Sequence, residues 1–355
     1  MKTAIFPLRN DSNLYIKIVA KCIEDAGYDV CDLQDALKSI KSMLALKVVN
    51  LNWYENLDNE PYMMFVKRTM LIMLLKLLHI KIIFTCHNKM PHEVKNERLM
   101  KFFIRFLCKK SDAIVGLSSD TYQVLSEYVN DNELKNKLHI IPHVTYKGSY
   151  IDKKVDFRMQ LNINKDTFVI LFVGAIRPYK NIELIIEAAK YFKDKKIVFV
   201  IAGGGKKEYL DSIRRDCKEL DNIKLVLRFI ENEEMFSLIK SSNILLIPYN
   251  VKTSLNSGVA ILAFSYKHTV ICPNIGTLND ISDKSLFYGY DYQNDEEHLK
   301  MIIQKIQDVY NLFLYDRERF DSIGEKVNNY VMKKYAPDII KQQYHVLYQS
   351  LLDKK

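Results

Sequence analysis

Several residue types that mark particular protein classes are scarce in this sequence. Its 355 residues include 11 Gly, 8 Pro, 6 Cys and 1 Trp. So little glycine and proline excludes collagen-like chains and Gly/Pro-rich disorder. The cysteines are scattered without a C-x-x-C pair, which indicates free thiols in a reducing compartment rather than a disulfide framework. No stretch reaches the roughly 20 apolar residues of a membrane span, and no signal-peptide pattern opens the chain. We therefore expect a cytoplasmic protein.

Positive charge is abundant and unevenly placed. Lys and Arg number 52 against 43 Asp and Glu, a net charge of +9. Residues 61–110 hold eleven of these cations and only two glutamates, so this segment carries a charge equal to that of the whole chain. Within 98–110, three cations step by four beside an apolar face: Lys101, Arg105 and Lys109. The pattern is typical of a helix at an anionic bilayer surface, and also of a core helix with a basic outer face.

From this charge pattern we expect an anionic membrane surface as a partner, with the protein peripheral on the inner face of the plasma membrane. Nucleic acid is not expected as a partner, because the basic segment matches no recognition module and its cations alternate with long apolar faces.

Short apolar runs alternate with amphipathic helical stretches in two series. Strands are expected at 3–8, 29–33, 46–52, 81–86, 113–117 and 139–142, and again at 168–173, 197–202, 223–227, 244–248 and 270–273. Nearly continuous apolar strands between helices predict parallel sheets covered on both faces. A polar segment at 146–165 separates the series. The chain is thus predicted to be α/β, with two Rossmann-like doubly wound domains facing across a cleft.

The loops that follow the strands are where ligands bind in such sheets. The segment 172–181 leaves a strand, turns at Gly174 and presents Arg177 and Lys180 before a helix. Two cations at this spacing can grip a diphosphate, Arg as a fork and Lys as a point charge. The alternative is a pair of solvated loop cations.

A second segment, 253–263, places small polar residues before an apolar helix. Asn256 or Ser257 is the expected N-cap, which would leave the amides of Ser257, Gly258 and Val259 for an anion. An ordinary capped helix is the alternative.

A third segment ends a strand at Cys86 and carries three titratable groups, His87, His92 and Glu93. His87 and Glu93 are the candidates for proton transfer from a hydroxyl, since an unperturbed imidazole titrates near 6.5. A hydrogen-bonded structural histidine is the alternative. A metal site is not expected, because the two histidines are five residues apart, which is not the spacing of a helical metal-ligand pair.

The chain resembles the GT-B glycosyltransferases, in particular family 4 of the nucleotide-sugar-dependent enzymes. The resemblance rests on 173–181, 200–205, 247–249, 257–263, 269–271 and 276–278, with further likeness at 112–118 and 140–143. It implies domains at 1–150 for the acceptor and 151–320 for the donor, with C-terminal helices at 321–355 crossing back to the first domain.

The same resemblance implies the donor site. Arg177 and Lys180 would hold the diphosphate, helped by the Ser257 and Gly258 amides. The loop at 228–230, with Arg228, would meet the nucleotide base. Residues after Gly276, including Thr277, would face the sugar or phosphate end of the donor.

Two departures from the family pattern stand out. Where the family commonly carries two glutamates eight positions apart, this sequence has Leu255 and Ala263. The loop 7–13 also lacks the usual glycine pair.

The function expected from the resemblance is transfer of a sugar from a UDP- or GDP-sugar to a membrane-associated acceptor, lipid-linked or glycan, in polysaccharide or glycolipid synthesis. No cofactor and no metal are expected. The alternative is a non-catalytic nucleotide or glycan binder that kept the fold, which the missing glutamates favour.

Overall fold

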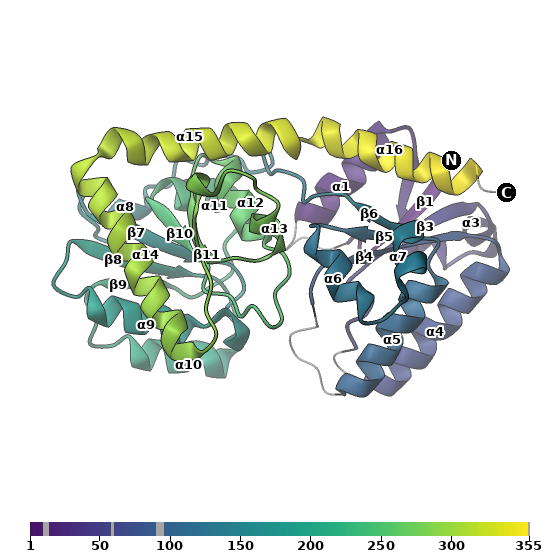
Figure 1. Ribbon diagram of the computed structural model, residues 1–355, viewed down its shortest axis with the longest axis horizontal. Helices are drawn as coiled ribbons and strands as arrows, with labels where there is room; N and C mark the ends of the chain where they lie inside the picture. Colours follow the sequence, from purple (N-terminus) through teal and green to yellow (C-terminus); the bar gives the residue numbers. More distant parts are fainter. Residues whose placement is uncertain (10–13, 58–59, 90–95, 354–355) are drawn as a thin grey trace.

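Two lobes stand side by side, and a helical segment at the C-terminus runs along both of them (Figure 1). This computed structural model describes residues 1–9, 14–57, 60–89 and 96–353. Each lobe contains one six-stranded sheet, and every strand pairing in both sheets is parallel. The expected α/β class with two doubly wound sheets is therefore confirmed.

The first sheet has the order β2-β1-β3-β4-β5-β6. Its strands are β1 (Lys2–Phe6), β2 (Asp29–Asp32), β3 (Leu46–Asn52), β4 (Lys81–Cys86), β5 (Ala113–Gly116) and β6 (Leu138–Ile140). Its helices are α1 (Leu14–Asp25), α2 (Leu33–Ala36), α3 (Ile40–Leu44), α4 (Pro61–Leu77), α5 (Glu97–Lys110), α6 (Asp120–Ser126) and α7 (Asp131–Lys137). The central strands are buried almost throughout, as a parallel sheet covered on both faces requires.

The second sheet has the order β12-β11-β10-β7-β8-β9. Its strands are β7 (Phe168–Val173), β8 (Ile197–Ala202), β9 (Ile223–Val226), β10 (Ile244–Leu246), β11 (Val270–Pro273) and β12 (Tyr288–Tyr290). Its helices are α8 (Phe157–Gln160), α9 (Ile182–Tyr191), α10 (Lys207–Asp216), α11 (Asn232–Lys240), α12 (Gly258–Ser265), α13 (Gly276–Asn279) and α14 (Asp295–Tyr315), with short 3-10 turns η1 (Pro178–Lys180) and η2 (Lys284–Leu286).

The chain ends in two helices, α15 (Arg317–Lys334) and α16 (Pro337–Asp353). In Figure 1 they form the yellow segment along one side, with α15 over the second lobe and α16 over the first. The helical segment expected at 321–355 is thus divided in two, because Pro337 has no amide proton to continue a helix. Among the described residues, no helix has both the length and the apolar character needed to cross a bilayer.

Gly203 allows the loops after β7 and β8 to touch. Its φ is +152°, and a Cβ there would lie 1.8 Å from the carbonyl oxygen of Gly174. Only glycine adopts this conformation without strain, and only glycine leaves room for that carbonyl. The residue therefore fixes the course of the loop that carries Arg177 and Lys180.

We expect Gly203→Ala to lower the free energy of unfolding by about 2–4 kcal/mol, through overpacking and backbone strain together. Gly27 is the matched control, since its φ is +95° but a Cβ there meets nothing within 4 Å. Gly27→Ala should cost only the strain, about 1–2 kcal/mol. Urea denaturation of the three proteins measures both values, and equal losses would contradict the close contact.

Candidate active site

Loops from the carboxyl edges of both sheets contact each other. Nδ2 of Asn256, which follows β10, donates to the backbone carbonyl of His87 after β4 at 3.2 Å. The amide of Lys89 donates to the carbonyl of Thr253 at 3.2 Å. Ligands of open α/β sheets bind beyond these strand ends. Predicted site residues of the two domains therefore meet at the edge where a ligand is expected.

A second contact between the domains joins the loop after β5 to α13. The amide of Ser119 donates to Oδ2 of Asp280 at 2.9 Å, and the Ser119 hydroxyl donates to the same carboxylate. A Cβ at Gly276 would lie 2.2 Å from Oγ of Ser118, so this approach requires a glycine.

A hydrogen-bond chain organises the first turn of α12. Oγ of Ser257, the N-cap, accepts from the amide of Ala260 at 3.2 Å. Oγ1 of Thr277 accepts from the Ser257 amide at 3.0 Å and donates to Oδ1 of Asn256 at 3.2 Å. The sequence analysis expected the Ser257 amide to be available to an anion, but this amide is already hydrogen-bonded to Thr277. The first turn leaves the amides of Gly258 and Val259 without a partner within the helix.

Lys180 is a buried cation at the end of η1. It is 9% exposed, and its Nζ lies 3.5 Å from the ring centroid of Tyr249. Burial, with a smaller contribution from the nearby charge of Arg177, lowers the pKa of Lys180 to about 7. Within the described part of the chain, no carboxylate lies within ion-pair distance of Lys180. An anionic ligand would supply the missing counter-charge.

The loop that carries Lys180 lies against α12. Gly174 has a φ of +136°, and a Cβ there would lie 3.9 Å from Cγ2 of Val259. Arg177 is exposed on the same loop, three residues before Lys180. The loop that carries one exposed and one buried cation therefore approaches the first turn of α12, and a helix N-terminus itself favours anions.

Arg228 has a partner of its own. Its guanidinium makes two hydrogen bonds to the carboxylate of Glu234, at 2.6 and 2.8 Å. This fork holds the loop after β9 to the start of α11. The neighbouring Phe229 is 46% exposed and could stack on a base.

His87 is buried and neutral. Its side chain is 6% exposed, and its Nε2 lies 3.0 Å from Oδ1 of Asn52. Because an amide oxygen only accepts, Nε2 carries the proton and Nδ1 remains an acceptor. Burial lowers the pKa of His87 to about 3, and the neighbouring His143 lowers it as well. The expectation of an unperturbed imidazole is therefore wrong, since burial penalises the charged ring.

The sequence patterns did not single out Trp53, which lies directly after β3. Its ring stacks on His87 with centroids 4.0 Å apart and planes 19° apart. Its φ is +48°, a rare conformation for a bulky residue and one that concentrates at functional sites. The sequence feature that could have pointed to Trp53 is a single tryptophan at the end of a predicted strand. Its half-buried ring presents an apolar face beside His87.

Glu93, the other candidate for proton transfer, and His92 lie outside the described residues. At the positions of the family glutamates, Leu255 and Ala263 are both fully buried. Leu255 packs into the apolar cluster of the first domain, so this position joins the domains instead of offering a carboxylate.

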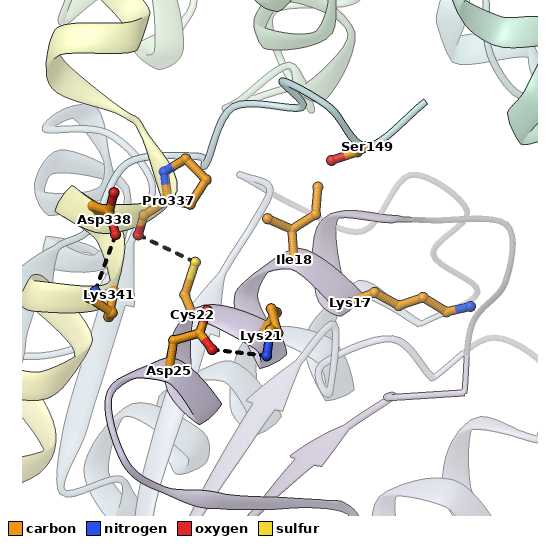
Figure 2. A pocket seen from close by; sticks show the side chains of 9 residues that line it. All are labelled: Lys17, Ile18, Lys21, Cys22, Asp25, Ser149, Pro337, Asp338 and Lys341. Atoms are coloured by element: carbon orange, nitrogen blue, oxygen red, sulfur yellow. Dashed lines mark hydrogen bonds and ion pairs between the residues drawn. The ribbon is translucent and has the colours of Figure 1, made fainter. Parts of the chain in front are cut away.

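Other residues line a cavity of about 280 Å³ (Figure 2). It is lined by Lys17, Ile18, Lys21, Cys22, Asp25, Ser149, Pro337, Asp338 and Lys341. Its wall contains paired charges: Lys21 with Asp25 at 2.9 Å, and Lys341 with Asp338 at 3.1 Å. It contains none of the predicted site residues.

Solved structures with this architecture identify the fold. Sucrose-phosphate synthase from Thermosynechococcus elongatus matches with a TM-score of 0.77 over 100% of both chains at 14% identity. Anabaena HepE in complex with UDP-glucose matches with a TM-score of 0.73, over 99% of this chain and 100% of that one, at 12% identity. The fold is the GT-B fold, as predicted.

The sequence comparisons show similarity to a glycosyltransferase family over part of the chain. The profile of glycosyl transferases group 1 matches residues 153–305, so the resemblance expected from the motifs is confirmed. The lipopolysaccharide 1,2-N-acetylglucosaminetransferase of Salmonella typhimurium is 26% identical over 221 residues, which are 59% of this chain and 55% of the relative. A GDP-mannose:glycolipid 4-beta-D-mannosyltransferase of Xanthomonas campestris is 23% identical over 232 residues, 64% of this chain and 61% of the relative. The matched part thus spans a little over half of each relative.

The state of His87 is open to direct measurement. We expect its ring to stay neutral in NMR spectra of histidine-labelled protein from pH 8 to pH 5, because its pKa is about 3. The unfolded chain binds this proton near 6.5, so His87 makes the fold less stable as pH falls from 6.5 towards 3. His87→Gln assigns the signal and should weaken that loss of stability. Titration of the assigned ring near pH 6.5 would contradict its burial.

Proposed function

We propose that this protein is a glycosyltransferase that moves a sugar from a UDP- or GDP-sugar to a lipid-linked or glycan acceptor. The observation that carries the proposal is Lys180, a buried cation on a loop against the N-terminus of α12, with no carboxylate of the described residues within ion-pair distance. A nucleoside diphosphate supplies the counter-charge that this arrangement lacks.

In this proposal the donor lies across the strand ends of the second domain. Its diphosphate contacts Arg177, Lys180 and the amides of Gly258 and Val259, and its base lies near Arg228 and Phe229. When the bond from the anomeric carbon to the phosphate oxygen breaks, negative charge collects on the leaving diphosphate. The two cations and the helix dipole stabilise that charge where it develops.

The acceptor sugar or the donor sugar meets the first domain at His87 and Trp53. A ring with a pKa of about 3 is a poor proton acceptor near neutral pH, so His87 serves as a neutral hydrogen-bond partner. Its Nδ1 accepts from a sugar hydroxyl, while Asn52 fixes the ring through Nε2. The apolar face of Trp53 packs against the sugar ring.

Two relatives that are named for lipopolysaccharide and glycolipid transfer support a membrane-associated acceptor. With such an acceptor, we propose that this protein acts on the inner face of the plasma membrane. We also propose that the reaction needs no metal, because Arg177, Lys180 and α12 supply positive charge to the leaving group. Activity should then persist in EDTA.

A second candidate is a non-catalytic nucleotide or glycan binder. The buried Leu255 and Ala263, in place of the family glutamates, favour it. Incubation with UDP- and GDP-sugars and a lipid extract separates the two functions. Release of UDP or GDP that depends on the extract supports the transferase, whereas nucleotide binding without any release supports the binder.

Replacement of Arg177 tests the donor contact. We expect Arg177→Ala to raise the Kd for the nucleotide-sugar at least tenfold, since a hydrogen bond to a charged group contributes about 1.5–3 kcal/mol. Isothermal titration calorimetry measures the change. Arg214→Ala is the matched control, because Arg214 is an exposed arginine of α10 that pairs with Asp211. An unchanged Kd in folded Arg177→Ala protein would remove this contact.

The pKa of Lys180 predicts a pH dependence. Free Lys180 loses its proton near pH 7, while a bound diphosphate favours the charged form, so binding takes up a proton above pH 7. Affinity for the nucleotide-sugar should fall as pH rises from 7 to 8.5, by at most about tenfold per pH unit. In Lys180→Met the affinity should be weaker and nearly independent of pH. A flat wild-type profile would exclude a titrating Lys180.

A further inference from the structure

Helix α4 exposes an apolar face that nothing in the described chain covers. Six of its side chains are between 39% and 73% exposed: Met63, Val66, Met70, Met73, Leu74 and Leu77. They recur three or four residues apart and so lie on one face of the helix, here named the α4 stripe. Tyr62, also of α4, and Phe102 of α5 extend the stripe; their side chains are 66% and 58% exposed. The opposite face packs on the sheet through Ile72 and Leu75.

Such a face is unusual on a surface helix, which normally turns polar residues to water. Contiguous exposed apolar surface with a polar rim marks a binding surface. The basic segment 61–110, which the charge pattern favoured for membrane contact, contains both α4 and α5, and its amphipathic stretch 98–110 differs from α4. Helix α5 buries the apolar side chains Met100, Phe103, Ile104, Leu107 and Cys108 in the core. The exposed apolar surface therefore belongs chiefly to α4.

The charge around the stripe is positive. Helix α4 contains no Asp or Glu, and Lys67 is exposed on it. Phe65 of α4 packs against Phe102 of α5 with ring centroids 5.9 Å apart, so the two helices are neighbours. Helix α5 adds the exposed cations Lys101, Arg105 and Lys109, of which Lys101 pairs with Glu97.

This combination selects among the possible occupants. A second copy bound face to face through the stripe would bring two basic rims together, and like charges oppose that contact. An anionic bilayer matches both parts of the surface, because acyl chains accept the stripe while lipid phosphates meet the cations. Helix α4 has 17 residues, about 25 Å of helix, and its buried face prevents it from spanning. It would therefore lie in the plane of the interface.

Helix α4 begins at the same edge of the first sheet as the candidate site residues. Helices α4 and α5 follow β3 and β4, so both begin at the carboxyl edge that carries Trp53 and His87. Nδ2 of Asn96, the N-cap of α5, donates to the hydroxyl of Tyr62 at 2.9 Å and joins the two helix starts. In Figure 1 the two helices lie together on the outer side of the first lobe, away from α16.

We propose that the α4 stripe inserts into an anionic bilayer, with Lys67 and the α5 cations at the lipid headgroups and the acceptor end of the cleft close to the membrane. This binding does not require the proposed sugar transfer, although it deepens that function by stating where a lipid-linked acceptor is met.

Flotation of the full chain with vesicles tests the proposal. Vesicles of phosphatidylcholine with 30% phosphatidylglycerol should bind the protein at low salt, and vesicles of phosphatidylcholine alone should bind it at least tenfold less. The variant Met70→Ser/Leu77→Ser should lose at least tenfold in affinity for the anionic vesicles. Tyr315→Ser/Val346→Ser, at exposed apolar positions outside the stripe, should bind as the wild type does.

A second measurement reports insertion itself. In a Trp53→Phe background, tryptophan fluorescence from Met70→Trp should be quenched by lipids brominated on their acyl chains, whereas Val346→Trp should not be. Nucleotide-sugar binding by Met70→Ser/Leu77→Ser should match that of the wild type. This control distinguishes a loss of membrane binding from a loss of nucleotide-sugar binding. Unchanged vesicle binding by this variant, absence of quenching, or a wild-type dimer that the variant dissociates would overturn the proposal.

Discussion

The crossing of the C-terminal segment from one domain to the other is the constraint on which the contact between the two sheet edges depends. Helix α16 buries Tyr344 and Tyr348 in the first domain, where the Tyr348 hydroxyl lies 3.2 Å from Oγ1 of Thr3. At the break before α16, the carbonyl of Tyr335 accepts from the amide of Thr145 at 3.0 Å. These contacts fix the end of the chain to the first domain and to the start of the linker, while α15 packs against α12 of the second domain.

The two sheet edges differ in the ionisable groups that they bury. On the second domain, Lys180 is buried, and none of the carboxylates that the structure describes pairs with it. Its charged form is therefore penalised by desolvation, and a bound anion would relieve that cost. On the first domain, His87 is buried as a neutral ring among Trp53, Tyr15 and Asn52, a setting suited to hydroxyl groups and sugar faces. This difference is the reason for proposing that the diphosphate binds to the second domain and the sugar to the first.

Much of the fold could be predicted from sequence because the central strands are continuous apolar runs. The bounds of β3, β4, β7, β8 and β11 match those expected, and so does the capped start of α12. The state of the site could not be predicted in this way. The neutral His87, the Thr277–Ser257 bond and the Arg228–Glu234 fork all depend on partners brought together by folding. The outward apolar face of α4 likewise appears only once its buried face is known.

The central claim, that the cleft between the sheets binds the diphosphate of a nucleotide-sugar, is tested most directly by a crystal structure soaked with UDP or with GDP. The account predicts diphosphate oxygens within hydrogen-bond distance of Arg177, Lys180 and the amides of Gly258 and Val259, with the base near Phe229. A nucleotide bound in the cavity between α1 and α16, or no nucleotide at either strand edge, would contradict it.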